Sequence, residues 1–383
     1  MVNVDENGST NKMHVVISCN TSWNLFNFRR GLIAQLLASG NSVTILAPKD
    51  DFSVRLHDMG CRFIDFPMDN KGTHIGKDFL LLLKYIKTIS SLKPDCILNY
   101  TIKPVIYGGM AARILRVPYI TTVTGLGTAF LTGLWLTRMV EKLYRISQCS
   151  AEKIFFQNRD DRDMFLSRRL VEQDRTGLIA GSGINLEYFK PKPKSPDRSM
   201  TFLLIGRLLW DKGIGEYIEA AKKIKETFPE TKFQLLGFLG VKNRTAISRE
   251  EIDAWVSENI VEYLGDSEDV RPYIANADCI VLPSYREGLP RTLLEAASMA
   301  RPIIATDVPG CRDVIDDGET GFLCRVKDAD DLAASIQKMI LVTDGQRVKM
   351  GMLGRQKVVN TFDEKIVIDK YMQTIQLVRD KKL

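Results

Sequence analysis

The chain has 383 residues, of which 45% are hydrophobic and 26% are charged, and its formal net charge is +6. This length exceeds what one hydrophobic core usually supports, so we expect two domains, and the balanced composition excludes a disordered or low-complexity chain. No apolar run reaches the roughly 18 residues of a membrane-spanning helix, and the polar N-terminus MVNVDENGSTNK does not resemble a signal peptide.

In the first half of the chain, short apolar runs alternate with segments of helical spacing. Strands are expected at residues 14–19, 42–48, 61–67, 95–100, 119–125, 153–158 and 175–181. Helices are expected at residues 27–40, 51–59, 77–92 and 105–116. Strands that alternate with helices in this way predict a parallel, doubly wound sheet.

A segment rich in proline and lysine, KPKPKSPDRS at 190–199, interrupts this pattern and is typical of a linker. The alternation then restarts, with strands expected at 201–206, 233–237, 261–265, 279–285, 302–306 and 321–326. Helices are expected at 214–227, 248–257, around Glu295, at 329–341 and at 363–379. The α/β pattern therefore predicts two Rossmann-like domains, 1–190 and 191–362, facing each other across a cleft. A C-terminal helix within 363–383 is expected to pack back toward the first domain.

Charge is distributed unevenly between the two halves. Residues 1–190 hold 24 Lys and Arg against 17 Asp and Glu, whereas the rest of the chain holds 29 against 30. A basic half can serve an anionic membrane surface, a nucleic acid or a phosphate-bearing substrate, and lysines that only confer solubility are the alternative. The seven scattered cysteines form no CxxC pair and predict buried, reduced thiols in a cytosolic protein.

Two cations follow the first strand of the second domain, in the segment GRLLWDKG. Ligands of doubly wound sheets bind at the carboxyl ends of strands, and Gly206 allows the backbone to approach a ligand there. Arg207 offers a bidentate fork and Lys212 a point charge, so the pair can bind a diphosphate. A plain turn with a solvated lysine is an equally good interpretation of this segment alone.

Two glutamates, Glu287 and Glu295, bracket the segment REGLPRTLLEAAS. A strand leads into it, and a tight turn opens a helix with Pro290 at its first position. The N–H groups at such a helix start can bind an anion. The spacing alone favours a surface helix with two solvated acids. Beside Arg207 and Lys212, it predicts the sugar and ribose ends of one pocket for a nucleotide-linked sugar.

Other motifs are absent or weak. Neither half contains the GxGxxG fingerprint, which disfavours a nicotinamide or flavin enzyme. The D-x-D pairs at 161–163 and 328–330 lie at expected helix starts, where acids cap helices. Only three histidines occur in the chain, so no histidine metal cluster is expected. The basic, aromatic segment 130–147 predicts either a helix on a membrane surface or a helix that faces the core.

Taken together, these motifs resemble the retaining glycosyltransferases of family 4, which have the GT-B fold. The resemblance rests on GRLLWDKG, SYREGLPRTLLEA, GSGINLEYF (181–189) and PGCRDVIDDGETGFL (309–323), and it extends from about residue 14 to the C-terminus. The segment 99–130 is similar to bacterial transferases that build O-antigen, capsule or N-glycan precursors on undecaprenyl diphosphate.

The resemblance implies a role for each matching residue. Arg207 and Lys212 would bind the donor diphosphate, Glu287 would face the donor sugar, and Glu295 would bind the ribose hydroxyls. The backbone after Gly288, at Leu289 and Pro290, would hold phosphate or sugar hydroxyls. No metal or other cofactor is then expected, because preorganised cations stabilise the leaving group.

The chain departs from the family pattern at three places, of which the first two lie on the acceptor side. Asn20, Thr21, Ser22, Trp23 and Asn24 replace the usual glycine pair, Ile102 and Lys103 replace a common histidine, and Asp313 stands where the family often has glutamate. Charge and position near strand ends suggest Arg29, Arg30 and Lys103 as ligands of an acceptor diphosphate.

The predicted function is that of a retaining hexosyltransferase, which moves a hexose or N-acetylhexosamine from a UDP-linked donor to a sugar on a lipid diphosphate. The enzyme is expected to be cytoplasmic and peripheral on the inner face of the plasma membrane, to take part in lipopolysaccharide or capsule biosynthesis, and to bind no nucleic acid. A UDP-sugar 2-epimerase of the same fold and a non-catalytic nucleotide-sugar-binding subunit are the alternatives.

Overall fold

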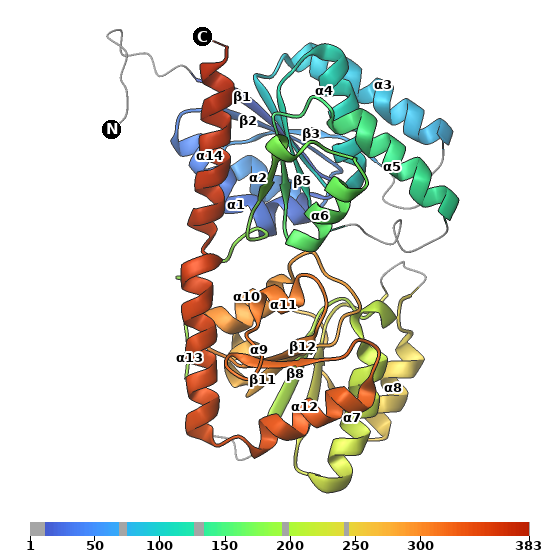
Figure 1. Cartoon of the computed structure of the whole chain (residues 1–383), viewed down its shortest axis with the longest axis vertical. Helices are drawn as coiled ribbons and strands as arrows, with labels where there is room; N and C mark the ends of the chain where they lie inside the picture. Colours follow the sequence, from blue (N-terminus) through green and yellow to red (C-terminus); the bar gives the residue numbers. More distant parts are fainter. Residues whose placement is uncertain (1–11, 69–74, 126–133, 194–198, 241–244, 383) are drawn as a thin grey trace. The chain divides into compact units, whose positions relative to one another are not determined.

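The computed structural model describes residues 12–68, 75–125, 134–193, 199–240 and 245–382, and it contains two compact units (Figure 1). Unit 1 comprises Met1–Ser182 and Lys365–Leu383, and unit 2 comprises Gly183–Glu364. The chain passes from one unit to the other twice, near residue 183 and near residue 364. These two segments are joined, because Ile184 forms a β-bridge with Asp363. The segment that precedes the Pro- and Lys-rich linker packs within unit 2, where the Ser298 hydroxyl donates to the Phe189 carbonyl over 2.8 Å.

Unit 1 is built on a seven-stranded parallel sheet of order β3-β2-β1-β4-β5-β6-β7. Its strands are β1 (His14–Ser18), β2 (Ser42–Ala47), β3 (Arg62–Asp65), β4 (Cys96–Tyr100), β5 (Tyr119–Val123), β6 (Lys153–Phe156) and β7 (Thr176–Leu178). Its helices are α1 (Ser22–Ala38), α2 (Phe52–Asp58), α3 (Ile75–Leu92), the π-helix η1 (Pro104–Gly108), α4 (Gly109–Leu115), α5 (Leu134–Gln148), α6 (Arg159–Ser167), the short η3 (Gln173–Arg175) and α14 (Glu364–Asp380).

Helices cover both faces of this sheet, as the alternating pattern predicts. α1, α2 and α14 pack on one face, and α3, α4, α5 and α6 pack on the other. The C-terminal helix α14 is joined to the sheet by a hydrogen bond between the hydroxyls of Tyr371 and Thr122. The Tyr371 ring also meets the Phe155 ring edge-on, with centroids 5.0 Å apart.

Unit 2 is built on a six-stranded parallel sheet of order β10-β9-β8-β11-β12-β13. Its strands are β8 (Thr201–Ile205), β9 (Lys232–Leu236), β10 (Glu262–Tyr263), β11 (Cys279–Leu282), β12 (Ile303–Thr306) and β13 (Gly321–Cys324). Its helices are η4 (Trp210–Lys212), α7 (Ile214–Thr227), α8 (Arg249–Ser257), α9 (Arg271–Asn276), α10 (Arg291–Ser298), α11 (Cys311–Val314), α12 (Ala329–Leu341) and α13 (Asp344–Thr361). The prediction of two doubly wound parallel sheets is therefore confirmed.

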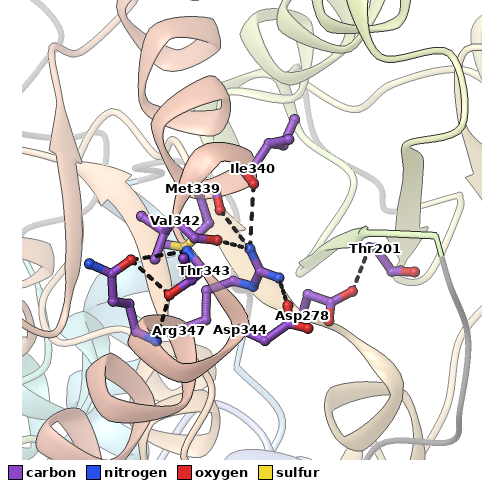
Figure 2. A network of polar contacts seen from close by, with 9 residues as sticks. Thr201, Asp278, Met339, Ile340, Val342, Thr343, Asp344 and Arg347 are labelled. Atoms are coloured by element: carbon purple, nitrogen blue, oxygen red, sulfur yellow. Dashed lines mark hydrogen bonds and ion pairs between the residues drawn. The ribbon is translucent and has the colours of Figure 1, made fainter.

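One long helix, α13, has no counterpart in the sequence prediction. Its start is fixed by a capping box, in which the Thr343 side chain accepts from the Gln346 N–H. Arg347, one turn further on, donates to the carbonyls of Met339, Ile340 and Val342, which end α12 (Figure 2). The guanidinium thus caps the C-terminus of α12 and fixes the sharp turn between the two helices.

In each sheet, the order in which successive strands are added reverses at one point. The chain winds outward from β1 and then restarts at β4 in unit 1, and it does the same from β8 and β11 in unit 2. Ligands of open α/β sheets bind outside the carboxyl ends of the strands at such a switch point. The topology therefore predicts ligand sites at the loops after β1 and β4 in unit 1 and at the loops after β8 and β11 in unit 2.

Candidate functional site

The residues predicted to bind the donor diphosphate and donor sugar lie at the switch point of unit 2, and Glu295 lies further along, in α10. Gly206, Arg207 and Lys212 follow β8, and the segment from Glu287 to Pro290 follows β11. The two strands are neighbours in the sheet, with Cys279 opposite Phe202 and Ile280 opposite Leu203. Sequence motifs that are about 75 residues apart are thus adjacent in space.

Lys212 and Glu287 form an ion pair at this point. The Lys212 ammonium contacts Oε1 of Glu287, and the two side chains are only 17% and 13% exposed. A lysine ammonium has three N–H donors, so it can keep this partner and still bind an anion. Arg207 differs from Lys212, because it is exposed and makes no polar side-chain contact within the described residues.

The loops that carry these residues are locked together by close backbone contacts. Gly213 has a φ of +73°, and a Cβ there would lie 2.0 Å from the Pro283 carbonyl oxygen. Gly310 has a φ of +82°, and a Cβ there would lie 2.6 Å from the Gly288 carbonyl oxygen. Any larger residue at either glycine would push the loops apart, so both glycines are required for the site's geometry.

Hydrogen bonds also join these loops. The Asp211 carbonyl accepts from the Tyr285 N–H over 3.0 Å and from the Ser284 hydroxyl over 3.3 Å. The Ser284 carbonyl in turn accepts from the Thr306 hydroxyl at the end of β12. The loops after three adjacent strands are therefore rigidly joined, which is what a preorganised site requires.

Glu295, the second predicted glutamate, is also nearly buried. Its side chain is 12% exposed, and Oε1 accepts from Nε of Arg291 over 2.9 Å, one turn earlier in α10. Burial raises the pKa of the Glu295 carboxyl, while the Arg291 charge acts in the opposite direction. Neither Glu287 nor Glu295 is the solvated surface acid that their spacing alone would also allow.

The start of α10 differs slightly from the prediction. Pro290 is the N-cap residue and Arg291 takes the first helical position, one residue later than expected. The Pro290 carbonyl accepts from the N–H groups of Leu293 and Leu294 at 3.1 and 3.4 Å. The shift follows from the backbone of Pro290, whose ψ of 115° is extended. Gly288 and Leu289 are half-buried in the turn before it.

Sequence reasoning missed a tyrosine and a glutamate that support the site. The Tyr285 hydroxyl donates to Oε1 of Glu216 on α7 over 2.8 Å, and the Lys327 ammonium lies 4.8 Å from the centre of the Tyr285 ring. Burial and the Glu216 carboxylate raise the pKa of Tyr285. Tyr285 stands in the predicted strand, but nothing in the sequence signals its partner, because Glu216 lies 69 residues away.

A buried thiol also lies beside the ion pair. Burial raises the pKa of Cys311, and the charges of Glu287 and Lys212 act on it in opposite directions. Cys311 is fully buried at the start of α11, where it is a small neutral side chain.

The three residues predicted for the acceptor side do not form one cluster. The Lys103 ammonium lies 2.8 Å from Oδ1 of Asp78, and the two side chains are 12% and 9% exposed. Arg29 is 4% exposed and stacks on the Tyr100 ring, 4.4 Å from its centre, with its Nε buried and without a hydrogen bond. Arg30 is exposed, and its guanidinium lies 5.5 Å from the Phe26 ring.

The basic segment 130–147 is described in part. Residues 126–133 lie outside the described residues, and side chains are described from Thr137 onward. In the described part, Val140 and Tyr144 are buried in the core, and the Tyr144 ring meets the Phe165 ring edge-on at 5.0 Å. Arg145 donates to the carbonyls of Arg168 and Arg169 at the end of α6. Of the two alternatives predicted for the segment, this described portion therefore matches the helix that faces the core.

None of the described helices is both long enough and apolar enough to cross a bilayer.

Comparison with known proteins matches both halves of the chain to one class of enzyme. Residues 199–341 match the family model described as glycosyl transferases group 1, and residues 14–158 match the model described as glycosyl transferase 4-like. The predicted resemblance is therefore confirmed.

Two relatives and one solved structure extend these matches. The chain is 27% identical to the N,N'-diacetylbacillosaminyl-diphospho-undecaprenol alpha-1,3-N-acetylgalactosaminyltransferase of Campylobacter jejuni, over 91% of this chain and 94% of the relative. It is 28% identical to the UDP-Gal:alpha-D-GlcNAc-diphosphoundecaprenol alpha-1,3-galactosyltransferase of Escherichia coli, over 77% of this chain and 78% of the relative.

The solved structure is that of the Anabaena protein HepE in complex with UDP and glucose. It superposes with a TM-score of 0.78 at 17% identity, over 95% of this chain and 99% of that chain. At this identity the likeness shows the fold, which is GT-B. The two family matches, the named relatives and the fold agree, and the chain belongs to the GT-B glycosyltransferases of the group 1 and family 4-like type.

Proposed function

We propose that this enzyme transfers a hexose or N-acetylhexosamine, with retention of anomeric configuration, from a UDP-linked donor to a sugar carried on a lipid diphosphate. The observation that carries the proposal is the group formed by Arg207, Lys212 and Glu287 at the switch point of unit 2. Two cations and one carboxylate at this edge suit the diphosphate and the sugar of a nucleotide-linked donor.

The chemistry places its main demand on the leaving group. The bond from the sugar C1 to the β-phosphate oxygen breaks, the acceptor hydroxyl oxygen bonds to C1, and the hydroxyl proton passes to the departing phosphate. Negative charge therefore develops on the nucleoside diphosphate, where Arg207 and Lys212 would stabilise it. Because these cations supply the positive charge, we propose that the reaction proceeds without a metal ion.

Glu287 and Glu295 would fix the two ends of the donor. Glu287, which is already paired with Lys212, would accept hydrogen bonds from sugar hydroxyls. Glu295 would accept hydrogen bonds from the ribose hydroxyls, and its pairing with Arg291 holds the carboxylate in place. The turn from Gly288 to Pro290 would hold phosphate or sugar hydroxyls through its backbone. The rigid junction of the three loops supports this arrangement, because a preorganised site reorganises little during the reaction.

The acceptor is proposed to be a sugar on diphosphoundecaprenol, since both named relatives are described as acting on such substrates. UDP is proposed as the leaving group, because UDP-Gal is named for one relative and UDP is bound in the HepE structure. Such an acceptor lies in a membrane, so the enzyme is proposed to work at the cytoplasmic membrane surface, with its basic unit 1 toward the lipid. Arg29, Arg30 and Lys103 are candidate contacts to the acceptor diphosphate.

The test measures UDP release from UDP-hexoses and UDP-N-acetylhexosamines, with and without a short-chain, lipid-diphosphate-linked sugar. We expect slow release without the acceptor and fast release, with a disaccharide product, in its presence. Shifts of Tm with UDP-, GDP- and ADP-sugars identify the base, because a ligand that binds only the folded state raises Tm.

Arg207→Ala should lower kcat by about a hundredfold to a thousandfold, the usual cost of losing one stabilising donor. The matched control is Arg249→Ala, which removes an exposed arginine at the start of α8 in the same unit. Near-normal turnover in Arg207→Ala, or an equal loss in Arg249→Ala, would refute the role of Arg207.

A further inference from the structure

The outward face of α3 carries three large apolar side chains that the core does not cover. Phe79, Leu80 and Leu83 are 59%, 65% and 46% exposed. Leu83 lies one helical turn after both Phe79 and Leu80, so the three side chains form one patch. Single exposed apolar residues are ordinary, whereas a contiguous patch of them usually marks a contact surface.

The helix has a separate face for the core. Asp78, Leu81, Tyr85 and Ile89 are buried against the sheet at helical spacing. Figure 1 shows α3 at the edge of the layer that it forms with α4 and α5. The apolar patch is thus additional to the residues that the fold needs, and folding alone does not account for it.

Three lysines lie along one side of the patch. Lys77 and Lys87 are exposed, and the ammonium of Lys84 lies 4.2 Å from the centre of the Phe66 ring at the side of the helix. An exposed apolar strip with lysines along one side suits the interface of an anionic bilayer, where apolar side chains enter the acyl region and lysines meet the lipid phosphates. In the described part of α5 the strip is absent, because Val140 and Tyr144 are buried and Ile146 is its only exposed large apolar side chain.

The patch also lies at a definite place on unit 1. Helix α3 runs back across the sheet toward the start of β4, so its first half lies at the carboxyl edge of the sheet. The ion pair between Asp78, next to the patch, and Lys103, just after β4, confirms this position. A bilayer that touched Phe79 and Leu80 would therefore lie beside the switch point of unit 1, where the acceptor is expected.

We propose that the Phe79, Leu80 and Leu83 face of α3, with Lys77, Lys84 and Lys87, is the surface by which this enzyme docks on an anionic lipid bilayer. The purpose of docking rests on the proposed function, which needs a membrane-borne acceptor. The docking itself depends only on these side chains. It is independent of 130–147, whose first residues lie outside the described part of the chain.

The test is sedimentation of the full-length protein with vesicles of phosphatidylethanolamine and phosphatidylglycerol, and with neutral phosphatidylcholine vesicles. Each large apolar side chain that leaves water strengthens binding by about tenfold. The combined variant Phe79→Ser, Leu80→Ser and Leu83→Ser should therefore lose about a hundredfold or more in binding to the anionic vesicles. Lys77→Ser with Lys87→Ser should lose about fivefold per lysine, and salt should mimic this loss.

The matched control removes as many exposed apolar residues from unit 2. Leu341, Val348 and Met352 are 68%, 65% and 53% exposed, so Leu341→Ser, Val348→Ser and Met352→Ser together should leave vesicle binding unchanged. Equal losses in the two triple variants, or undiminished binding by the α3 variant, would overturn the proposal. It would also fail if the wild type formed a dimer that the α3 variant did not form and neither protein bound vesicles.

A water-soluble, short-chain acceptor separates this proposal from the proposed function. The α3 triple variant should transfer sugar to that acceptor at the wild-type rate, since its substitutions are confined to the outer face of α3. Transfer without vesicle binding in the wild type would refute docking and leave the transferase assignment intact. Vesicle binding without transfer to any acceptor would support docking and refute the transferase assignment.

Discussion

The two switch points have the same topology but differ in the glycines and in the unpaired charge that their loops carry. In unit 2, the loops after β8 and β11 contain Gly213, whose missing Cβ allows a close contact with Pro283, and a cation, Arg207, that is exposed and free of polar contacts with the described residues. In unit 1, the loop after β1 and the turn after β4 contain no glycine, and Thr101 takes the left-handed conformation with a φ of +64°.

The charges differ in the same way. Lys212 is paired with Glu287, so at the switch point of unit 2 the exposed Arg207 guanidinium remains available for an anion. In unit 1, Lys103 is neutralised by the nearly buried Asp78, and Arg29 is covered by Tyr100. The comparison supports the proposed phosphate site at the edge of unit 2, and it favours a role in stability over acceptor binding for Lys103 and Arg29 in unit 1.

The largest expected effect is at Gly213. Gly213→Ala would place a methyl group 2.0 Å from the Pro283 carbonyl oxygen and would also force alanine to a φ of +73°. We expect the free energy of unfolding of unit 2 to fall by more than about 3 kcal/mol, since a backbone clash adds to a left-handed cost of about 1–2 kcal/mol. Urea denaturation, followed with donor binding, measures this loss.

Gly265→Ala is the matched control for that loss. Gly265 has a φ of +76°, but no atom lies within 4 Å of the added Cβ. It should therefore cost only the left-handed term of about 1–2 kcal/mol. Equal destabilisation by the two variants would mean that the contact between the loops after β8 and β11 contributes nothing.

The next effect concerns Lys103 and Asp78 in unit 1. Lys103→Ala would leave a nearly buried carboxylate without its partner, which typically costs about 3 kcal/mol or more. The double variant Lys103→Ala with Asp78→Asn should recover most of that stability. Thermal unfolding checks both values. An increase in acceptor KM without any loss of stability in Lys103→Ala would show instead that Lys103 binds the acceptor.

The donor edge could be predicted further than the acceptor edge, and the reason is physical. Residues that follow adjacent parallel strands must meet at one edge, so GRLLWDKG and SYREGLPRTLLEA placed Arg207, Lys212 and Glu287 together without coordinates. The ion pairs could not be predicted in this way, because the partners Lys212 and Glu287 lie 75 residues apart and only their packing decides the contact. The same holds for Tyr285 with Glu216 and for Lys103 with Asp78.

Helix α13 was missed for a different reason. Its sequence, DGQRVKMGMLGRQKVVNT, contains three glycines and buries only Met350, Gly351, Gly354 and Val358. Two of these are glycines, so no apolar stripe marks the buried face and the hydrophobic period is lost. Gly351 is needed because a Cβ there would lie 2.1 Å from the Ala300 carbonyl oxygen, so close packing against the end of α10 replaces the usual apolar contact.

A smaller effect is expected from the titration of Glu295. Its pKa is raised above the ordinary 4.5 by burial, so the folded protein binds this proton more tightly than the unfolded chain does. As the pH falls through the raised pKa, the fold should gain stability from this group while donor affinity falls by about tenfold, because a neutral carboxyl loses its charged hydrogen bonds to the ribose.

Calorimetric titration with UDP and thermal unfolding over the same pH range test the two opposite trends. Glu295→Gln should remove both of them, and Glu319→Gln, at an exposed acid of the same unit, should remove neither. Donor affinity that stays constant in the wild type as the pH falls toward 4.5 would exclude the ribose role of Glu295.

The smallest effect on stability, and the sharpest test of the comparison, is at Thr101. This residue is β-branched and left-handed, and its hydroxyl accepts from the Asn20 N–H over 3.3 Å, which ties the end of β4 to the loop after β1. Backbone strain of this kind is often retained where it positions functional groups. If so, the strain at Thr101 positions the loops at the switch point of unit 1, as the close glycine contacts position those of unit 2.

Thr101→Gly relieves a left-handed cost of about 1–2 kcal/mol and loses a hydrogen bond worth about 1 kcal/mol, so stability should stay within about 1 kcal/mol of the wild type. Lys93→Gly, at an exposed left-handed residue after α3 with a φ of +45°, is the matched control. We expect acceptor KM to rise several-fold in Thr101→Gly alone, with donor hydrolysis unchanged in both variants and partial recovery in Thr101→Ser, which restores the hydroxyl. If Thr101→Gly were stabilised as much as Lys93→Gly and kept a normal acceptor KM, the strain would serve only the fold, and the edge of unit 1 would have no positioned counterpart to the donor site.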